Sequence, residues 1–516
     1  MNSIRIQNLR SLADTGEIVL RPITILVGEN SSGKSTFLRS FPLFRQSVEV
    51  TKAGPILWFG RYVDFGSFRE AINVYSEKET MTFSFSFSNV GSIHRYYPYF
   101  FNLTHEPPTI TFTVGIVSDL KLDSTVDWCE VTFDDNSLSL EFENRLVKKF
   151  VVNNTDFTKY TDKFKTFSEK GILPLLLVEE KHERQGKETK SLTRPNLLRI
   201  IKEELEKNLD IKFQEEEFEI LIEELGLGST EAMLKQIKSF SKINDSTLKR
   251  KIKNWTVDNP CYISLRDKLF AVSISNILSF CNELFTDFAE NVRYIAPLRA
   301  TAERYYRYQN LSVDEVDFQG QNLAMFIRNL SEGQQKQFSE WMETMFGFSP
   351  SIINSPGHVS LQVQQGEKLN ANLADMGFGF SQVLPILTQL WQLGQKNFPI
   401  ISKTYPWAKP TTFFVIEQPE LHLHPRLQSK LAIAFANIVK QAQKQNNDVR
   451  LIIETHSDGM VNSFGRLIAN GQLNKEEIDI VLFEKQFANQ PSKIKISQFS
   501  DSGFLQNWPI GFFEPD

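Results

Sequence analysis

The stretch from Gly28 to Thr36, GENSSGKST, constrains the fold more than any other part of the sequence. The apolar and β-branched run 23–27 precedes it, and residues 37–41 after it are compatible with a helix. A strand, a glycine-bounded loop, a lysine with a hydroxyl residue, and a helix in this order predict a P-loop. Gly28 and Gly33 allow the tight turn that points successive backbone N–H groups toward phosphate oxygens.

The side chains of the loop predict a particular ligand, ATP with Mg²⁺. Lys34 is expected to reach the β- and γ-phosphates, and the Ser35 hydroxyl is expected to bind Mg²⁺. The loop backbone around Ser31, Gly33 and Thr36 is expected to hold the phosphates. The N-terminus of the following helix adds partial positive charge at the same place.

Three strands far along the chain complete the predicted nucleotide-binding sheet. Residues 411–416, 450–454 and 478–483 are almost continuously apolar, as strands of a buried parallel sheet are. A P-loop at one end of the sequence and these strands at the other predict one ATPase domain, split by the middle of the chain.

Two of these strands end in polar residues suited to ATP hydrolysis. The strand 412–417 ends in Glu417, and Glu420 follows in a Gln-Pro-Glu turn, which is a Walker B pattern with two carboxylates. We expect Glu417 to hold Mg²⁺ through water and Glu420 to act as general base. The alternative in which Glu417 is itself the base stays open. The strand 450–454 leads to His456, which at the carboxyl end of a buried strand is expected to touch the γ-phosphate and orient the water.

The region 61–158 has the period-two alternation of antiparallel strands, clearest at residues 81–87. The chain has 43 phenylalanines, and many of them alternate with polar residues, which predicts half-buried sheet. Further strands are expected at 109–114, 126–133 and 137–142.

The region 159–291 is predicted to be a helical insertion. Residues 197–205 have helical spacing, and 265–291 is expected to be one long amphipathic helix. Sustained heptads are missing, so the long coiled-coil arm of a chromosome-structuring protein is not expected. The basic cluster at 249–253 is interpreted as a solvated helix face rather than a DNA contact.

Overall composition excludes some classes of function. The net charge of −5 gives no global basic field for non-specific nucleic-acid binding. Three widely spaced cysteines form neither a zinc pattern nor a disulfide framework. The first residues do not resemble a signal peptide, and no apolar segment is long enough for a membrane span. We expect a cytoplasmic protein without a membrane partner.

The motifs GENSSGKST, VIEQPELHLHP and IIETHSD, in this order, resemble those of the ABC-class ATPases of the SMC and OLD group. The resemblance is good over 1–60 and 290–516. It implies a dimer or higher oligomer in which two heads enclose two ATP molecules. By resemblance, Asn30 would contact the γ-phosphate, Arg10 or Ser11 would lie near the adenine, and His424 would lie near the dimer interface.

Two stretches compete for the signature motif that such a head presents to its partner's nucleotide. The segment 330–335, LSEGQQ, has the closer wording but lies too far before the Walker B strand; we interpret it as a helix start capped by Ser331. The segment 375–382, DMGFGFSQ, directly precedes one clear helix and is better placed. Its candidate nucleotide contacts are Gly377, Gly379 and Ser381.

The predicted fold is α/β, an ABC-type P-loop ATPase head with an antiparallel β lobe and an inserted helical subdomain. The expected domains are 1–60 and 292–516 for the two parts of the head, 61–158 for the β lobe and 159–291 for the helical insertion.

The resemblance also implies a role for the head. It extends to the ATPase subunits of bacterial anti-phage systems such as Septu and certain retrons, which implies a sensor or regulator of a separate HNH-type effector nuclease. Nucleic acid, either DNA or retron msDNA, is a further possible partner. The alternative is a DNA-repair or chromosome ATPase that binds DNA directly, and a third reading is that the chain is itself a nuclease.

Overall fold

The computed structural model consists of two compact units, and each is described by itself. The described residues are 1–88, 102–103, 108–161, 164–167, 170–184, 187–193, 202–203, 206, 225–239, 250, 252–307, 313–366, 369–395, 411–485 and 490–508. The first unit contains Met1–Val19 and Leu43–Glu290; the second contains Leu20–Pro42, Asn291–Ser402 and Lys409–Asp516. The predicted head segment 1–60 is therefore divided between the two units.

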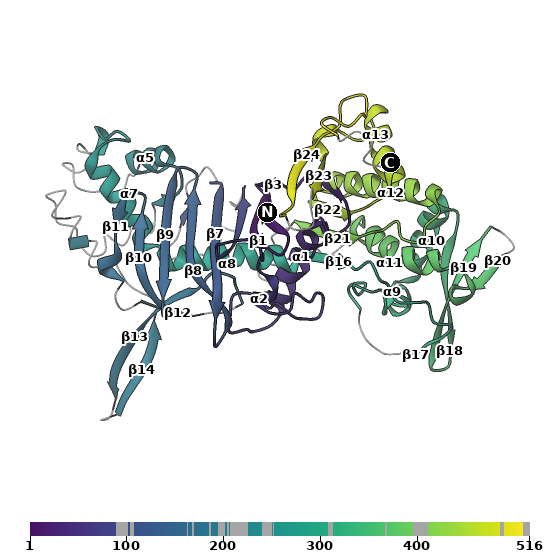
Figure 1. Ribbon diagram of the computed structural model, residues 1–516, viewed down its shortest axis with the longest axis horizontal. Helices are drawn as coiled ribbons and strands as arrows, with labels where there is room; N and C mark the ends of the chain where they lie inside the picture. Colours follow the sequence, from purple (N-terminus) through teal and green to yellow (C-terminus); the bar gives the residue numbers. More distant parts are fainter. Residues whose placement is uncertain are drawn as a thin grey trace. The chain divides into compact units, whose positions relative to one another are not determined.

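The first unit is built on a 12-stranded antiparallel sheet (Figure 1). Its main path runs β14-β13-β12-β10-β9-β8-β7-β5-β1-β2, with β11 paired to β10 and β3 to β1. The strands are β1 (Ser3–Leu9), β2 (Leu12–Asp14), β3 (Ile18–Val19), β5 (Met81–Phe87), β7 (Ile110–Asp119), β8 (Asp123–Phe133), β9 (Asn136–Glu143), β10 (Leu146–Val152), β11 (Thr155–Asp156), β12 (Phe164–Phe167), β13 (Leu175–Arg184) and β14 (Lys187–Thr193). A separate parallel pair joins β6 (Asn102–Leu103) and β15 (Gly226–Leu227).

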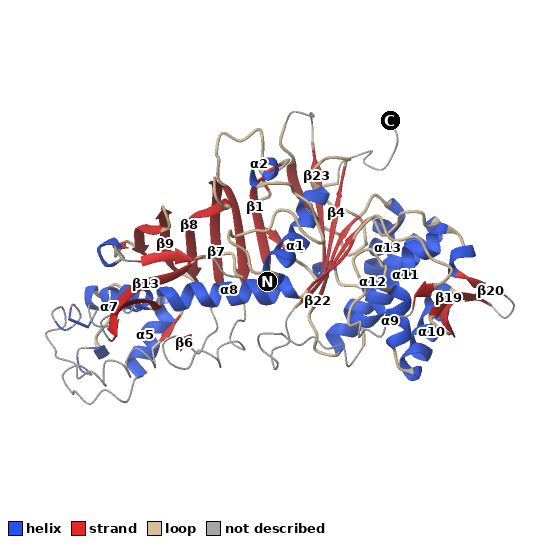
Figure 2. Cartoon of the chain, turned by 90° about the horizontal axis from the view of Figure 1, so that it is seen from below, coloured by secondary structure: helices blue, strands red, loops and turns tan. Residues whose placement is uncertain are grey.

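The alternating phenylalanines of this sheet form its core, as the period-two pattern predicts. In β5, Met81, Phe83, Phe85 and Phe87 are all buried. The helix α8 (Ile274–Glu290) lies along one face of the sheet (Figure 2). The ring of Phe85 meets that of Phe285 from α8 edge-on, with 5.1 Å between the centroids. The sheet therefore has one face covered by a helix.

The predicted helical insertion 159–291 is only partly helical. Its described part contains the strands β12–β14, so the antiparallel sheet extends further along the chain than the prediction of a β lobe ending at 158. Among the described residues, the helices of this unit include α2 (Phe68–Ala71), α5 (Thr230–Ser239), α7 (Pro260–Val272) and α8. Most of the predicted helix at 197–205 and part of the 249–253 cluster lie outside the described residues.

The single long helix predicted at 265–291 is wrong. The chain forms α7 and α8, which are bent by 60° at Ser273. Among the described residues, no single helix is long and apolar enough to cross a membrane, and these two pass that test of length and composition only as a bent pair.

The second unit contains a six-stranded sheet in the order β16-β21-β22-β4-β23-β24. All neighbouring strands are parallel except β23 and β24. The strands are β4 (Ile23–Gly28), β16 (Val292–Ile295), β21 (Thr412–Glu417), β22 (Val449–Glu454), β23 (Ile478–Glu484) and β24 (Lys493–Ser497). The three C-terminal parallel strands predicted from their apolar runs are confirmed, and each is buried along nearly its whole length.

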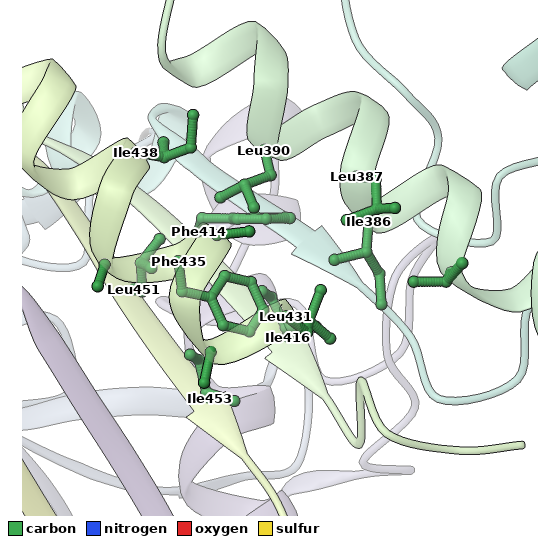
Figure 3. Close-up of a cluster of buried hydrophobic side chains, with 14 of the residues drawn as sticks. Ile386, Leu387, Leu390, Phe414, Ile416, Leu431, Phe435, Ile438, Leu451 and Ile453 are labelled. Carbon is green, nitrogen blue, oxygen red and sulfur yellow. The ribbon is translucent and has the colours of Figure 1, made fainter. Parts of the chain in front are cut away.

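Helices α11 (Phe378–Leu393), α12 (Pro425–Lys444) and α13 (Asp458–Ala469) share one apolar core with strands of this sheet, and α9 (Leu323–Asn329) and α10 (Glu332–Phe346) belong to the same core. The helix α1 (Lys34–Glu49) belongs to this unit up to Pro42, and its Phe37 and Phe41 rings meet those of Phe483 in β23 and Phe413 in β21. Figure 3 shows Leu390 of α11 and Phe435 of α12 against Phe414 of β21. This packing fixes the strand ends, where the polar residues predicted for the nucleotide site lie.

A smaller antiparallel sheet completes the second unit. It contains β17 (Tyr306–Arg307), β18 (Ser349–Ser355), β19 (His358–Gln365) and β20 (Leu369–Asn372). Ser331 caps α10, because its side chain accepts from the N–H of Gln334, whose own side chain bonds back to the Ser331 N–H. The interpretation of LSEGQQ as a helix start is therefore confirmed. The predicted α/β class, with an antiparallel lobe and a P-loop sheet, is confirmed as well.

Candidate nucleotide-binding site

The loop between β4 and α1 has the backbone conformation of a phosphate-binding loop. A Cβ atom at Gly28 would lie 2.2 Å from the carbonyl oxygen of Phe483, so only glycine fits there. Gly33 has φ +97°, and Ser31 also takes the left-handed region with φ 61°. Asn30 and Ser31 are exposed at the tip of the loop, and Thr36 is half-buried in the first turn of α1.

Lys34 lies folded over this loop. Its Nζ donates to the carbonyl oxygens of Gly28 at 3.0 Å and Glu29 at 2.7 Å. Burial lowers the pKa of Lys34, while the nearby Glu454 and Glu420 oppose the shift. The ammonium group is therefore held in the loop and interacts electrostatically with Glu454 and Glu420.

The strand order brings two acidic strand ends beside the P-loop strand. β22 lies between β21 and β4, and the register pairs Glu417 with Glu454 and Glu454 with Leu26. Parallel strands end at the same edge of a sheet, so Glu454 lies between Glu417 and the P-loop.

Glu454 is the acid that contacts the P-loop. The Ser35 hydroxyl donates to Glu454 Oε1 at 2.8 Å. Only 2% of Glu454 is exposed. Burial and then repulsion by Glu417 raise the pKa of Glu454 to about 7. Glu454 was not among the predicted site residues, although its position at the end of a buried strand, two residues before His456, was a signal.

Glu417, the predicted Mg²⁺ residue, is bound by other side chains. Arg39 donates from Nε to Oε1 and from Nη2 to Oε2, both at 2.8 Å. The Tyr294 hydroxyl donates to Oε1 at 2.6 Å. This ion pair raises the pKa of Arg39, and burial raises that of Tyr294. Sequence reasoning missed both partners; Arg39 lies one helical turn after Ser35, which places it on the same face of α1.

Glu420 and His456, the predicted base and γ-phosphate contact, lie together. Glu420 Oε1 accepts from the backbone N–H of His456 at 2.7 Å, and Glu420 Oε2 is buried with no partner. Burial raises the pKa of Glu420. His456 is exposed at the surface, yet the protein around its ring removes part of the hydration of the charged form; this desolvation and the charge of Lys34 lower its pKa. Both residues interact electrostatically with Lys34 of the P-loop, and their roles stay predictions.

Arg299 is a buried cation at the same edge of the sheet. Its Nη2 donates to the backbone oxygen of Glu417 at 2.8 Å, while Nε and Nη1 are buried with no partner. Burial lowers the pKa of Arg299 to about 10, against the attraction of Glu420 and Glu417. No sequence motif marks this residue.

The preferred signature segment starts α11 and packs on the loop after the Walker B strand. A Cβ at Gly379 would lie 2.7 Å from the carbonyl oxygen of His422, so glycine allows this close approach. The exposed Phe378 meets the His422 ring edge-on, with 4.9 Å between centroids. Gly377 is exposed with open space around it. Ser381 is buried, and its hydroxyl donates to the Phe378 carbonyl at 2.8 Å, so it points into its own helix.

Two further residues of the resemblance have other contacts. His424 is the N-cap of α12 and accepts from the N–H of Arg426 at 3.3 Å. Arg10 belongs to the first unit, where its guanidinium lies over the ring of Phe65 at 4.3 Å. The predicted places of Arg10 and Ser11 near the adenine stay predictions.

The family model for an AAA ATPase domain, AAA_15, matches residues 1–461. The chain belongs to this AAA ATPase family. Membership makes it a nucleotide-binding protein of the ATPase type, as the P-loop indicates. No curated protein matches the chain.

Solved structures similar to this AAA ATPase include Smc head domains. An Smc head bound to the C-winged helix domain of ScpA has 11% identity, covers 96% of each chain and gives a TM-score of 0.34. The Smc head domain from Thermotoga maritima has 10% identity, with 96% of this chain and 97% of that one covered and a TM-score of 0.33.

The residues of this AAA ATPase fit a Mg²⁺ ion held together with nucleotide phosphates. Among the described residues, no group of three or more His, Cys, Asp or Glu side chains could hold a metal alone. Mg²⁺ in nucleotide sites is bound by one or two protein oxygens, with phosphates and water completing the octahedron. The Ser35 hydroxyl and the buried Glu454 Oε2, which has no partner, supply such oxygens.

Proposed function

We propose that this AAA ATPase binds ATP with Mg²⁺ and hydrolyses it. The observation that carries the proposal is the meeting of Lys34, Ser35 and three buried carboxylates at one edge of the parallel sheet. The loop supplies backbone N–H groups and an ammonium for the phosphates. Glu420 would polarise the attacking water, and the exposed His456 would orient it against the γ-phosphate.

Phosphate release by the purified chain tests this activity. Lys34→Ala should lower turnover by about 10²–10³-fold, the usual cost of losing a preorganised charge at the reacting group. Lys336→Ala is the control, because its side chain is 78% exposed on α10. Equal turnover in wild type and Lys34→Ala would refute ATP hydrolysis at this loop.

We further propose that two copies associate when ATP is bound. The start of α11 and the loop after the Walker B strand form one exposed surface with Gly377, Phe378, His422 and His424. By the family resemblance of the sequence motifs, both segments would lie at the nucleotide of a second copy. An exposed aromatic ring in contact with a histidine is the kind of group that a partner surface buries.

The dimer is tested by sedimentation with a slowly hydrolysed ATP analogue. Phe378→Asp should abolish the nucleotide-dependent dimer and leave the melting temperature unchanged. Phe504→Asp, at a ring that is 74% exposed in the same unit, is the matched control and should still dimerise. A dimer that survives Phe378→Asp would contradict this choice of surface.

The effector of the switch is proposed from the family resemblance alone. This resemblance implies a separate HNH-type nuclease that the ATPase controls in bacterial anti-phage defence. Co-purification with the product of the neighbouring reading frame, and nuclease activity that depends on ATP, would support this role. No observation on the described residues favours direct DNA binding, and part of the 249–253 cluster lies outside them.

A further inference from the structure

The P-loop hydroxyl and the Walker B acid do not meet in this protein. The Ser35 hydroxyl donates to Glu454 Oε1, one strand away from Glu417. The cause is the strand order, because β22 lies between β21 and the P-loop strand β4. The end of β22 is therefore closer to the P-loop than the end of β21.

Both carboxylate oxygens of Glu417 are already committed to other groups. Arg39 pairs with both of them at 2.8 Å, and Tyr294 adds a hydrogen bond at 2.6 Å. The Glu417 backbone is fixed as well, since Arg299 donates to its carbonyl oxygen. A planar guanidinium bound through two parallel hydrogen bonds is the strongest common partner of a carboxylate. Glu417 would have to leave these partners to serve a metal ion.

Glu454 has the opposite arrangement. Oε1 accepts a hydrogen bond from the Ser35 hydroxyl, and Oε2 is buried with no hydrogen-bond partner. An unpaired buried carboxylate oxygen is costly, so native sites satisfy such atoms with a donor, water or ion. The lone pairs of the Ser35 oxygen stay available to Mg²⁺ while its proton is held by Glu454.

We propose that Glu454, together with Ser35, is the protein's acidic group at the Mg²⁺ site. Its Oε2 supplies the carboxylate oxygen for the ion or for a water bound to it, and Oε1 orients the serine. Glu417 is then a structural acid that ties β21 to α1 through Arg39 and to β16 through Tyr294. The inference rests on the proposed binding of ATP with Mg²⁺ and names the acid that serves that site.

The test measures binding of Mn²⁺, a paramagnetic substitute for Mg²⁺, by electron paramagnetic resonance with a non-hydrolysable ATP analogue. Glu454→Gln and Glu417→Gln make the same chemical change on neighbouring strands. Glu454→Gln should weaken Mn²⁺ binding by about 10–100-fold, the usual effect of losing a group that supports a metal site. Glu417→Gln should change the Mn²⁺ affinity by less than about threefold while lowering the melting temperature.

Two controls keep the outcomes distinct. Analogue binding by the wild type in the presence of Mg²⁺, followed by fluorescence, tests the nucleotide site itself; its absence would overturn the proposed function and the inference with it. If Glu417→Gln does not fold, Tyr294→Phe loosens Glu417 more gently and should also leave the Mn²⁺ affinity unchanged. Weakening by Glu417→Gln or Tyr294→Phe that equals or exceeds the effect of Glu454→Gln would overturn the assignment of Glu454.

Discussion

Replacing Tyr294 by phenylalanine removes one hydroxyl from the buried cluster around Glu417. The hydroxyl donates to Glu417 Oε1 at 2.6 Å, and Tyr294 and Glu417 are 3% and 2% exposed. The ring itself stays in place, stacked on Phe318 with an interplanar angle of 9°. The substitution therefore removes one hydrogen bond to a charged acceptor and little packing.

The size of the effect follows from the charge and burial of the acceptor. A hydrogen bond to a charged group contributes about 1.5–3 kcal/mol to stability. Arg39 still holds both oxygens of Glu417 after the substitution, so we expect the lower part of this range, about 1.5–2 kcal/mol. Since 1.4 kcal/mol is a factor of ten, amide protection should fall by about 10–30-fold.

Hydrogen exchange read by mass spectrometry resolves this loss by segment. Peptides from β16 and β21 should exchange faster, because Tyr294 lies in β16 beside Val415 of β21. Tyr306→Phe is the matched control, since its hydroxyl oxygen accepts from the neutral N–H of Glu303 at 3.1 Å, near the surface. We expect Tyr306→Phe to lower the local stability by about 0.5–1 kcal/mol.

Two results would contradict this role of the Tyr294 hydroxyl. Unchanged protection in β16 and β21 would mean that the hydroxyl does not stabilise Glu417. An equal loss of protection in β7 of the first unit would mean that the substitution acts globally and not through the contact with Glu417.

Three further predictions test other parts of the structure. Gly379→Ala should weaken the ATP-dependent dimer seen by sedimentation, because the added Cβ would lie 2.7 Å from the His422 carbonyl oxygen. Gly377→Ala is the control and should leave the dimer unchanged, because the space around Gly377 is open. Equal weakening by both substitutions would contradict the close approach at Gly379. The hydrogen bond from Arg5 lowers the pKa of Asp14 to about 2, below the value in the unfolded chain. The stabilisation that ionised Asp14 provides is therefore complete above about pH 4 and is lost as the pH falls toward 2. The urea midpoint of Asp14→Asn should therefore lie below that of wild type at pH 6 and approach it at pH 2.5, and a constant gap would refute this linkage. Phe85→Ala should lower the free energy of unfolding of the first unit by about 3–5 kcal/mol, because the ring is fully buried among other phenylalanines. Hydrogen exchange of β5 and β7 measures this loss, and a loss below about 1 kcal/mol would contradict the prediction.

Local patterns predicted the elements that depend on neighbouring residues. The alternation at 81–87 predicted β5, the apolar runs predicted β21, β22 and β23, and Ser331 with Gln334 predicted the start of α10. Such features depend on side-chain period and capping within a few residues, so no knowledge of distant contacts is needed. The continuation of the antiparallel sheet through 164–193 escaped this reasoning, because a polar strand at the end of a sheet has a weak period-two signal.

Sequence patterns were enough to predict a P-loop, the acidic residues that follow the buried strands, and the membership of these strands in one sheet. Which of these acids contacts the P-loop became clear from the strand order in the folded protein. The lateral order of parallel strands depends on crossovers and packing between segments hundreds of residues apart, and this order places β22 between β21 and β4. Glu454 therefore contacts Ser35, while Glu417, the acid with the more familiar motif, is paired with Arg39 and Tyr294.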